Sequence, residues 1–304
     1  MIRSTVLVVG GEAVDAGVGP AVCELARRTR TGVLNTWRAK GLFRFDDPAH
    51  LGTIGLQRDD LVLAGVAGEQ RSFERVVLCG VADGELPDQL TGGLPADAEV
   101  VSPGDVAALH LDVRDDWLPR PPLYDALASV CGPRYLVDDV PLSPVRAAGD
   151  LAAWLPAGAV VTADAGAPGF WLGRTFPTRT PQTVLLPARP DPQFTTRVVA
   201  SASAGCVVVR GPGAPVAERD EVDAAPGCAV GRGGAGARWV VVERWLPDGP
   251  RLSPAARLSQ LDAVVAAGGG VVEVGVDLDD VGALEEVAGP VVVWGGPATG
   301  WGAA

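Results

Sequence analysis

The stretch Cys206-Val-Val-Val-Arg-Gly-Pro-Gly213 joins an apolar run to a glycine-flanked turn. A short apolar run of this kind predicts a strand buried on both faces, as in a parallel sheet covered by helices. Similar runs occur at Val6–Val9, Val76–Cys79 and Ala159–Thr162, and stretches rich in Ala, Leu and Arg separate them. This alternation predicts an α/β protein.

Prolines divide the chain into two α/β series, because six of them fall between Trp117 and Pro144. We therefore expect two doubly wound, mainly parallel, Rossmann-like domains. The first covers residues 1–117, a linker covers 118–142, and the second covers 143–304 and ends in a Gly-rich tail. Further strands are expected from Val33 and at Glu99–Val101, Gln182–Leu186, Arg238–Val242 and Gly270–Val274. The expected helices are Pro20–Arg28, Tyr124–Val130, Ser143–Trp154, Phe170–Thr175, Phe194–Ala204, Val216–Ala225 and Pro254–Ala267. Val281–Val287 and Pro290–Trp294 close the second series, and Gly227–Gly236 is expected to be a flexible loop.

The composition argues against several classes of function. A net charge of −12 disfavours nucleic acid, since phosphate binding relies on clustered Lys and Arg. No apolar run approaches the ~20 residues that span a membrane, and Met1–Gly10 is interpreted as a strand rather than a signal peptide. The five cysteines form no C-x-x-C pair, which favours free thiols in a reducing cytoplasm. The two histidines, His50 and His110, lie far apart in sequence, so a zinc site is not expected.

The first half resembles the central domain of acetolactate-synthase-like thiamine-diphosphate enzymes. The resemblance rests on Ala39-Lys40-Gly41, Asp47-Pro48, Gly52-Thr-Ile-Gly55 and the strand ending at Gly80. Lys40 is the one lysine of the chain. Central domains of this family sometimes hold FAD or an ADP-containing ligand, so a nucleotide is a possible cofactor of residues 1–115.

The second half resembles the family's diphosphate-binding domain, in Val160-Val-Thr-Ala-Asp-Ala-Gly166, Phe170-Trp171 and Val207–Gly213. The resemblance implies that Asp164, Gly166, Gly211, Pro212 and Gly213 form a vestigial site for the diphosphate and its metal. In the family, an Asp between the two glycines and an Asn about thirty residues later hold Mg²⁺, which requires hard oxygen ligands.

Both metal ligands of the family are replaced in this chain. Pro212 stands at the Asp position and has neither a side-chain oxygen nor a backbone N–H. The Asn position falls within Val242–Trp245, where the sequence has no Asn. The family's pyrimidine-binding domain, which supplies a catalytic Glu, has no counterpart in the sequence, and Glu12 is expected to be a first-turn helix residue instead. We therefore expect no catalytic residue, no metal and no cofactor, with thiamine diphosphate plus magnesium as the alternative.

Other polar residues are expected to be structural. Asp59-Asp60 is predicted to be a pair of solvated loop or helix-start carboxylates rather than a metal pair. Arg174 and Arg179 are predicted to be surface arginines or a remnant phosphate or partner contact. Trp294 and Trp301 are expected either to pack on a partner chain or to lie in a loosely tethered tail.

The hypothesis from sequence is a degenerate, non-catalytic relative with a binding or regulatory role. It would self-associate or meet a separate pyrimidine-domain chain. The alternatives are a subunit of a split thiamine-diphosphate-dependent 2-oxo acid decarboxylase or acetolactate-synthase-like enzyme, and a nucleotide-binding module.

Overall fold

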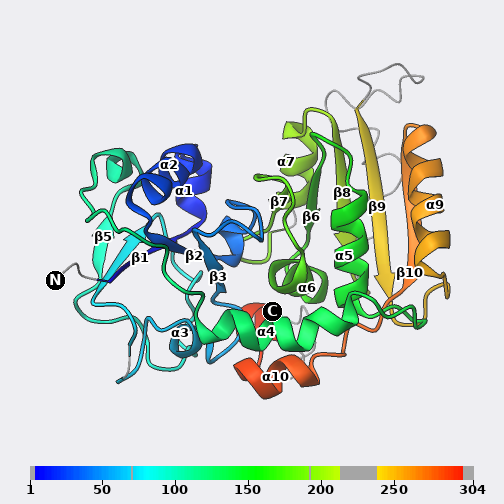
Figure 1. The fold of residues 1–304 in the computed structure, drawn as a ribbon. Helices are drawn as coiled ribbons and strands as arrows, with labels where there is room; N and C mark the ends of the chain where they lie inside the picture. The colour runs from blue at the N-terminus through cyan, green and yellow to red at the C-terminus, as the bar shows by residue number, and fades with distance from the viewer. Residues whose placement is uncertain (1–3, 70, 192, 213–237, 297–304) are drawn as a thin grey trace.

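The computed structural model describes residues 4–69, 71–191, 193–212 and 238–296, which form two five-stranded sheets lying side by side (Figure 1). The first sheet has the order β3-β2-β1-β4-β5 and the second the order β10-β9-β8-β6-β7, and neighbouring strands within each sheet are parallel. The strands are β1 (Thr5–Val9), β2 (Gly32–Thr36), β3 (His50–Ile54), β4 (Arg75–Cys79), β5 (Glu99–Val101), β6 (Val160–Ala163), β7 (Val184–Leu185), β8 (Gly205–Arg210), β9 (Trp239–Leu246) and β10 (Gly269–Gly275). The predicted α/β fold with two parallel sheets is confirmed.

Helices cover these sheets. They are α1 (Gly11–Asp15), α2 (Gly19–Thr29), α3 (Asp60–Leu63), α4 (Pro122–Arg134), α5 (Pro144–Trp154), α6 (Ala167–Thr175), α7 (Phe194–Ser201), α9 (Pro254–Ala266) and α10 (Gly282–Ala288), with 3-10 turns η1 (Trp37–Ala39), η2 (Pro103–Ala108) and η3 (Val293–Gly295). All five residues of β1 and of β2 are buried, as an apolar run covered on both faces requires. In the described part of the chain, no helix is long and apolar enough to cross a membrane.

The segment between the two series contains a longer helix than we predicted. Helix α4 has 13 residues, with Pro122 in its first turn, where the missing N–H breaks no helical hydrogen bond. It runs beneath both sheets (Figure 1) and packs against α10, α3, α5 and β3. The expected linker 118–142 is thus largely a structural element, while the domain boundaries stay a prediction.

Strand β3 was not predicted, because Gly52 and Gly55 interrupt the apolar pattern typical of a strand. Residues Gly52 to Ile54 instead pair with β2, and the register shifts between Val33 and Leu34. Gly52 takes a φ of +139° inside the strand. A glycine tolerates this left-handed backbone, which lets the strand absorb the irregularity.

The end of the described chain crosses back to the first sheet. Arg58 N donates to Pro290 O at 2.9 Å, and Val292 N donates to Leu56 O at 3.0 Å. Trp294 is 9% exposed, and its ring lies 5.8 Å from that of Trp37, edge to face. The expectation of a loose or partner-bound Trp294 is therefore wrong. The predicted helix Val216–Ala225, the loop 227–236 and Trp301 lie outside the described residues.

Candidate functional site

The sequence-predicted site lies at the carboxyl ends of two neighbouring strands. Asp164 and Gly166 follow β6, and Gly211 and Pro212 follow β8. The two strands are paired in register, with Ala163 opposite Val209. The fold thus brings these four residues to one edge of the second sheet, while Gly213 lies outside the described residues.

An ion pair occupies this edge. Arg210 Nε lies 3.7 Å from Asp164 Oδ2, with side chains 12% and 32% exposed. Burial raises the pKa of the Asp164 carboxyl, and the Arg210 charge acts in the opposite direction. Gly166 precedes the wholly buried helix α6 with a φ of +125°, so this backbone conformation favours glycine.

The residues present do not fit a magnesium-bridged diphosphate. Pro212 is exposed and has no oxygen in its side chain, and the Asp164 carboxylate already faces a guanidinium. At the position expected for the Asn ligand, Glu243 is fully buried and bonded to Arg257 through both carboxylate oxygens. Among the described residues, no group of three His, Cys, Asp or Glu side chains could hold a metal ion.

The crevice where a doubly wound sheet binds nucleotides is filled in the first sheet. The strand order changes direction between β1 and β4, where such sheets bind their ligands. There the two backbones meet, since Gly10 N donates to Cys79 O at 3.0 Å and Glu12 N donates to Gly80 O at 2.9 Å. A Cβ at Gly10 would lie 2.4 Å from Gly80 O, so glycine is required.

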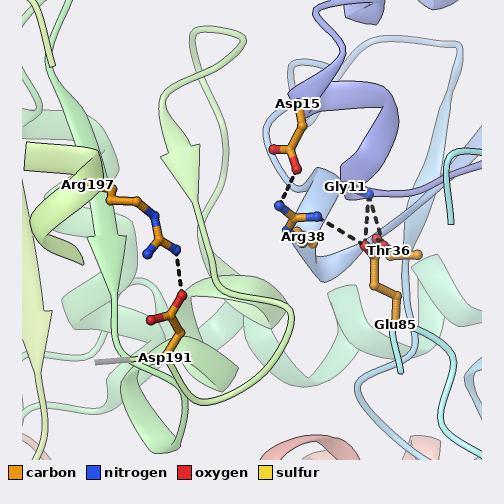
Figure 2. Close-up of polar contacts among 7 residues, drawn as sticks. All are labelled: Gly11, Asp15, Thr36, Arg38, Glu85, Asp191 and Arg197. Atoms are coloured by element: carbon orange, nitrogen blue, oxygen red, sulfur yellow. Dashed lines mark hydrogen bonds and ion pairs between the residues drawn. The ribbon is translucent and has the colours of Figure 1, made fainter. Parts of the chain in front are cut away.

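A carboxylate takes the place that a phosphate would occupy at this turn (Figure 2). The buried Glu85 accepts from Gly11 N at 2.9 and 3.1 Å and from Thr36 Oγ1 at 2.5 Å, and Arg38 Nη1 lies 3.7 Å from it. Burial raises the pKa of Glu85. The amide that would contact a phosphate in a dinucleotide fold is therefore already bonded.

A polar groove of about 590 Å³ opens beside this carboxylate, between the two sheets. Its arginines are mostly paired, because Arg38 also contacts Asp15 and Arg197 contacts Asp191 (Figure 2). The charged lining residues are Glu12, Arg38, Asp83, Arg189, Asp191 and Arg197. Three acidic and three basic side chains give the groove no excess charge of either sign.

A second, mainly apolar cavity of about 480 Å³ lies between β3, α4, α5 and α6. Leu123, Leu127 and Phe176 contribute to its apolar wall, and Lys40 faces it from the end of η1. The Lys40 side chain forms no hydrogen bond or ion pair with any other residue that the structure describes. The volume is within the range of about 300–1,000 Å³ typical of small-molecule sites.

The cavity changes the protonation of the groups that line it. Burial, reinforced by the Arg174 charge, lowers the pKa of Lys40 to about 7. Burial and the Lys40 charge lower the pKa of His50 to about 3. Burial raises the pKa of Cys131 to about 11 and raises that of Tyr135. At neutral pH, His50, Cys131 and Tyr135 are therefore uncharged, and a large fraction of Lys40 is neutral.

A buried ion pair joins the two sheets behind this cavity. Arg174 Nη2 donates to both carboxylate oxygens of Asp60 at 2.8 Å, and Nη1 donates to Thr53 O at 3.1 Å. Both charged side chains are fully buried. Asp60 is a helix-start residue, as expected, since it begins α3, but it is buried rather than solvated. The interpretation of Arg174 as a surface arginine is wrong, because Arg174 bonds to Asp60 and to Thr53 O of the first sheet. Arg179, by contrast, is exposed as expected.

This arrangement of two parallel sheets is similar to part of the fold of two solved structures, which include a thiamin diphosphate-dependent enzyme. A protein from Mycobacterium smegmatis, assigned as a thiamin diphosphate-dependent enzyme, matches with a TM-score of 0.59 and 16% identity over 90% of this chain and 62% of its own. Benzoylformate decarboxylase from Polynucleobacter necessarius matches with a TM-score of 0.57 and 12% identity over 90% of this chain and 61% of its own.

In sequence, the chain is similar to a probable acetolactate synthase large subunit from Methanocaldococcus jannaschii. The two are 26% identical over 211 residues, which cover 59% of this chain and 35% of that protein. The chain thus spans about a third of the curated relative it matches. No family model matches it. The predicted resemblance to acetolactate-synthase-like thiamine-diphosphate enzymes is confirmed in sequence and in fold.

Neither the cavity nor the contacts of Glu85 were predicted from the sequence. Lys40 was singled out only within Ala39-Lys40-Gly41 and as the one lysine of an arginine-rich chain. The residues next to Lys40 in sequence do not predict an apolar cavity.

Proposed function

We propose that this chain is a non-catalytic relative of the thiamine-diphosphate enzymes with a binding or regulatory role. The observation that carries the proposal is the ion pair of Arg210 with Asp164 at the end of β8, beside Pro212, which stands at the position predicted for the metal ligand of the family. A guanidinium at this edge repels a divalent cation, and proline supplies no donor to a phosphate. The cavity beside Lys40 is the site proposed for the bound small molecule.

Isothermal titration with thiamine diphosphate, with and without Mg²⁺, tests the loss of the cofactor. We expect no magnesium-dependent heat up to millimolar ligand. Thermal unfolding gives a second readout, since a ligand at 100 times its Kd stabilises the folded state by about 2.7 kcal/mol. Micromolar, magnesium-dependent binding would refute the proposal.

A second candidate is a subunit of a split enzyme. The chain matches about a third of an acetolactate synthase large subunit, which is compatible with a partner chain that supplies the pyrimidine-binding domain. Mixing the protein with such a chain, thiamine diphosphate and Mg²⁺ should then release CO₂ from a 2-oxo acid. Absence of both complex formation and CO₂ release would exclude this candidate for the chain tested.

Self-association is part of the leading proposal, because diphosphate-binding domains of the family normally meet another subunit. Light scattering during size-exclusion chromatography measures it, and a monomer at all concentrations would contradict it. The nucleotide alternative receives no support from the β1 turn, where Glu85 bonds the Gly11 amide.

A further inference from the structure

We infer that the Lys40 amine captures aldehydes or ketones with an apolar body, as a reversible imine inside the cavity between the two sheets. The inference rests on the binding role proposed above, and it names the ligand class and the residue that holds the ligand. It does not depend on the thiamine-diphosphate edge, which lies at the ends of β6 and β8.

The backbone holds Lys40 firmly at the junction of the two sheets. Lys40 N donates to Trp37 O at 3.1 Å within the η1 turn. The next residue, Gly41, accepts from Gln182 N at 2.7 Å, and Phe45 N donates to Thr178 O at 2.9 Å. Segments from both halves of the chain thus fix the base of the side chain, so the amine is presented to the cavity by a rigid support.

No negative charge in the described structure neutralises the amine. The lining contains the carboxylate of Asp150, which is bonded to Arg146 at 2.9 Å, and the buried Asp60 is bonded to Arg174. The remaining titratable or charged groups of the lining are His50 from β3, Tyr124 and Cys131 from α4, Tyr135 directly after α4, Arg174 from α6, and Arg179 after α6. Uncharged groups and arginines around a lysine favour the neutral, nucleophilic form of its amine.

The cavity walls select the body of the ligand. Leu123, Leu127 and Phe176 bury apolar surface, and Phe45 and Leu136, which are 39% and 81% exposed, mark the open side. Arg174 Nη1 and Nη2 are already bonded to Thr53 O and to Asp60, so the inner wall offers a carboxylate only the Nε–H of Arg174 and not a two-pronged guanidinium. These features favour a neutral carbonyl compound over a 2-oxo acid.

The chemistry balances without a further reagent. The nitrogen lone pair of neutral Lys40 attacks the carbonyl carbon, and a C–N bond forms as the C=O π bond breaks. One proton moves from nitrogen to oxygen to give a carbinolamine. The C–O bond then breaks and the second N–H proton leaves with the oxygen as water, which yields the imine. Water reverses each step, so the capture is an equilibrium.

Reductive trapping tests the inference on the full chain. The protein is incubated with benzaldehyde and sodium cyanoborohydride, and the intact mass and peptide map are measured from pH 6 to pH 10. We expect one benzyl group on Lys40, with a labelling rate whose midpoint is near pH 7 rather than near the ordinary lysine value of about 10.4. The labelling rate of the N-terminal amine serves as the internal reference. The labelling rate of Lys40 in urea-unfolded protein gives the value for a lysine with an ordinary pKa.

Two variants and one analogue make the outcomes distinct. Lys40→Met should lose the label at the mapped peptide, and Lys40→Arg, which keeps a charge, should lose it too. Labelling of Lys40 no faster at pH 7 than in unfolded protein would overturn the inference. If benzyl alcohol still raises the melting temperature while Lys40 stays unlabelled, the binding role survives and the imine fails. If benzaldehyde does not label Lys40 and benzyl alcohol does not raise the melting temperature, both the imine and the binding role are refuted.

Discussion

Replacing Arg174 with methionine tests whether the buried ion pair holds the two sheets together. The change removes two hydrogen bonds of 2.8 Å to Asp60 and one of 3.1 Å to Thr53 O. Asp60 then keeps only the backbone donors Leu56 N at 2.8 Å and Gln57 N at 3.1 Å. Its carboxylate is left fully buried without a counter-charge, which costs about 3–5 kcal/mol. This is a large share of the roughly 5–15 kcal/mol that stabilises a typical folded protein.

Urea unfolding followed by tryptophan fluorescence measures the change in the free energy of unfolding. The matched control is Arg197→Met, because Arg197 also pairs with an aspartate, Asp191, but is 58% exposed. An exposed pair contributes only about 0–1 kcal/mol. Asp60→Asn, alone and combined with Arg174→Met, completes a double-mutant cycle, in which the double variant should lose clearly less than the sum. A loss for Arg174→Met no larger than that of the control would refute the reasoning.

Two further predictions concern the cavity. The pKa of Lys40 is lower in the folded state than in the unfolded state, so the unfolded state binds more protons between about pH 7 and pH 10.4. The free energy of unfolding of the wild type, measured relative to that of Lys40→Met, should therefore rise across this pH range. We expect this relative free energy of unfolding to increase by on the order of 1–2 kcal/mol between pH 7 and pH 9, since solvent in the cavity reduces the full effect. A difference between wild type and variant that does not change with pH would contradict the lowered pKa. Gly149→Ala places a Cβ 2.5 Å from Tyr135 Cδ1 and should cost about 1–3 kcal/mol through overpacking. Gly132→Ala, with nothing within 4 Å of its Cβ, should stabilise α4 by up to about 1 kcal/mol, and equal melting temperatures for the two variants would disprove the packing argument.

The regular elements were predictable because each leaves a local signature. The apolar run at Val6–Val9 lies within β1, and the expected helix Pro20–Arg28 lies within α2 (Gly19–Thr29). The expected helix Ser143–Trp154 matches α5 (Pro144–Trp154) to within one residue, and Ser143 is its N-cap although its side chain forms no capping hydrogen bond. Strand β3 was missed because its glycines weaken the pattern on which such predictions depend.

The return of the chain to the first sheet was not predictable from local pattern. Helix α10 was placed in the second series, but Gln57 Nε2 donates to Leu284 O at 2.9 Å and to Gly289 O at 2.8 Å. Ala288 belongs to the buried core of the first sheet, together with Leu61. Hydrophobic periodicity shows that a helix face is buried, but it carries no information about which sheet buries it.

The sequence by itself determined the alternation of strands and helices and the resemblance to thiamine-diphosphate enzymes, and it led to the prediction that Pro212 stands at the family's metal position, because these depend on short segments. Only the tertiary structure decided which polar groups meet. Glu85 bonds Gly11 across 74 positions and Arg174 bonds Asp60 across 114, and Lys40 faces a cavity whose walls come from both halves of the chain. The physical reason is that desolvation and pairing of charges depend on the atoms gathered around a group, and those neighbours are set by the packing of distant segments.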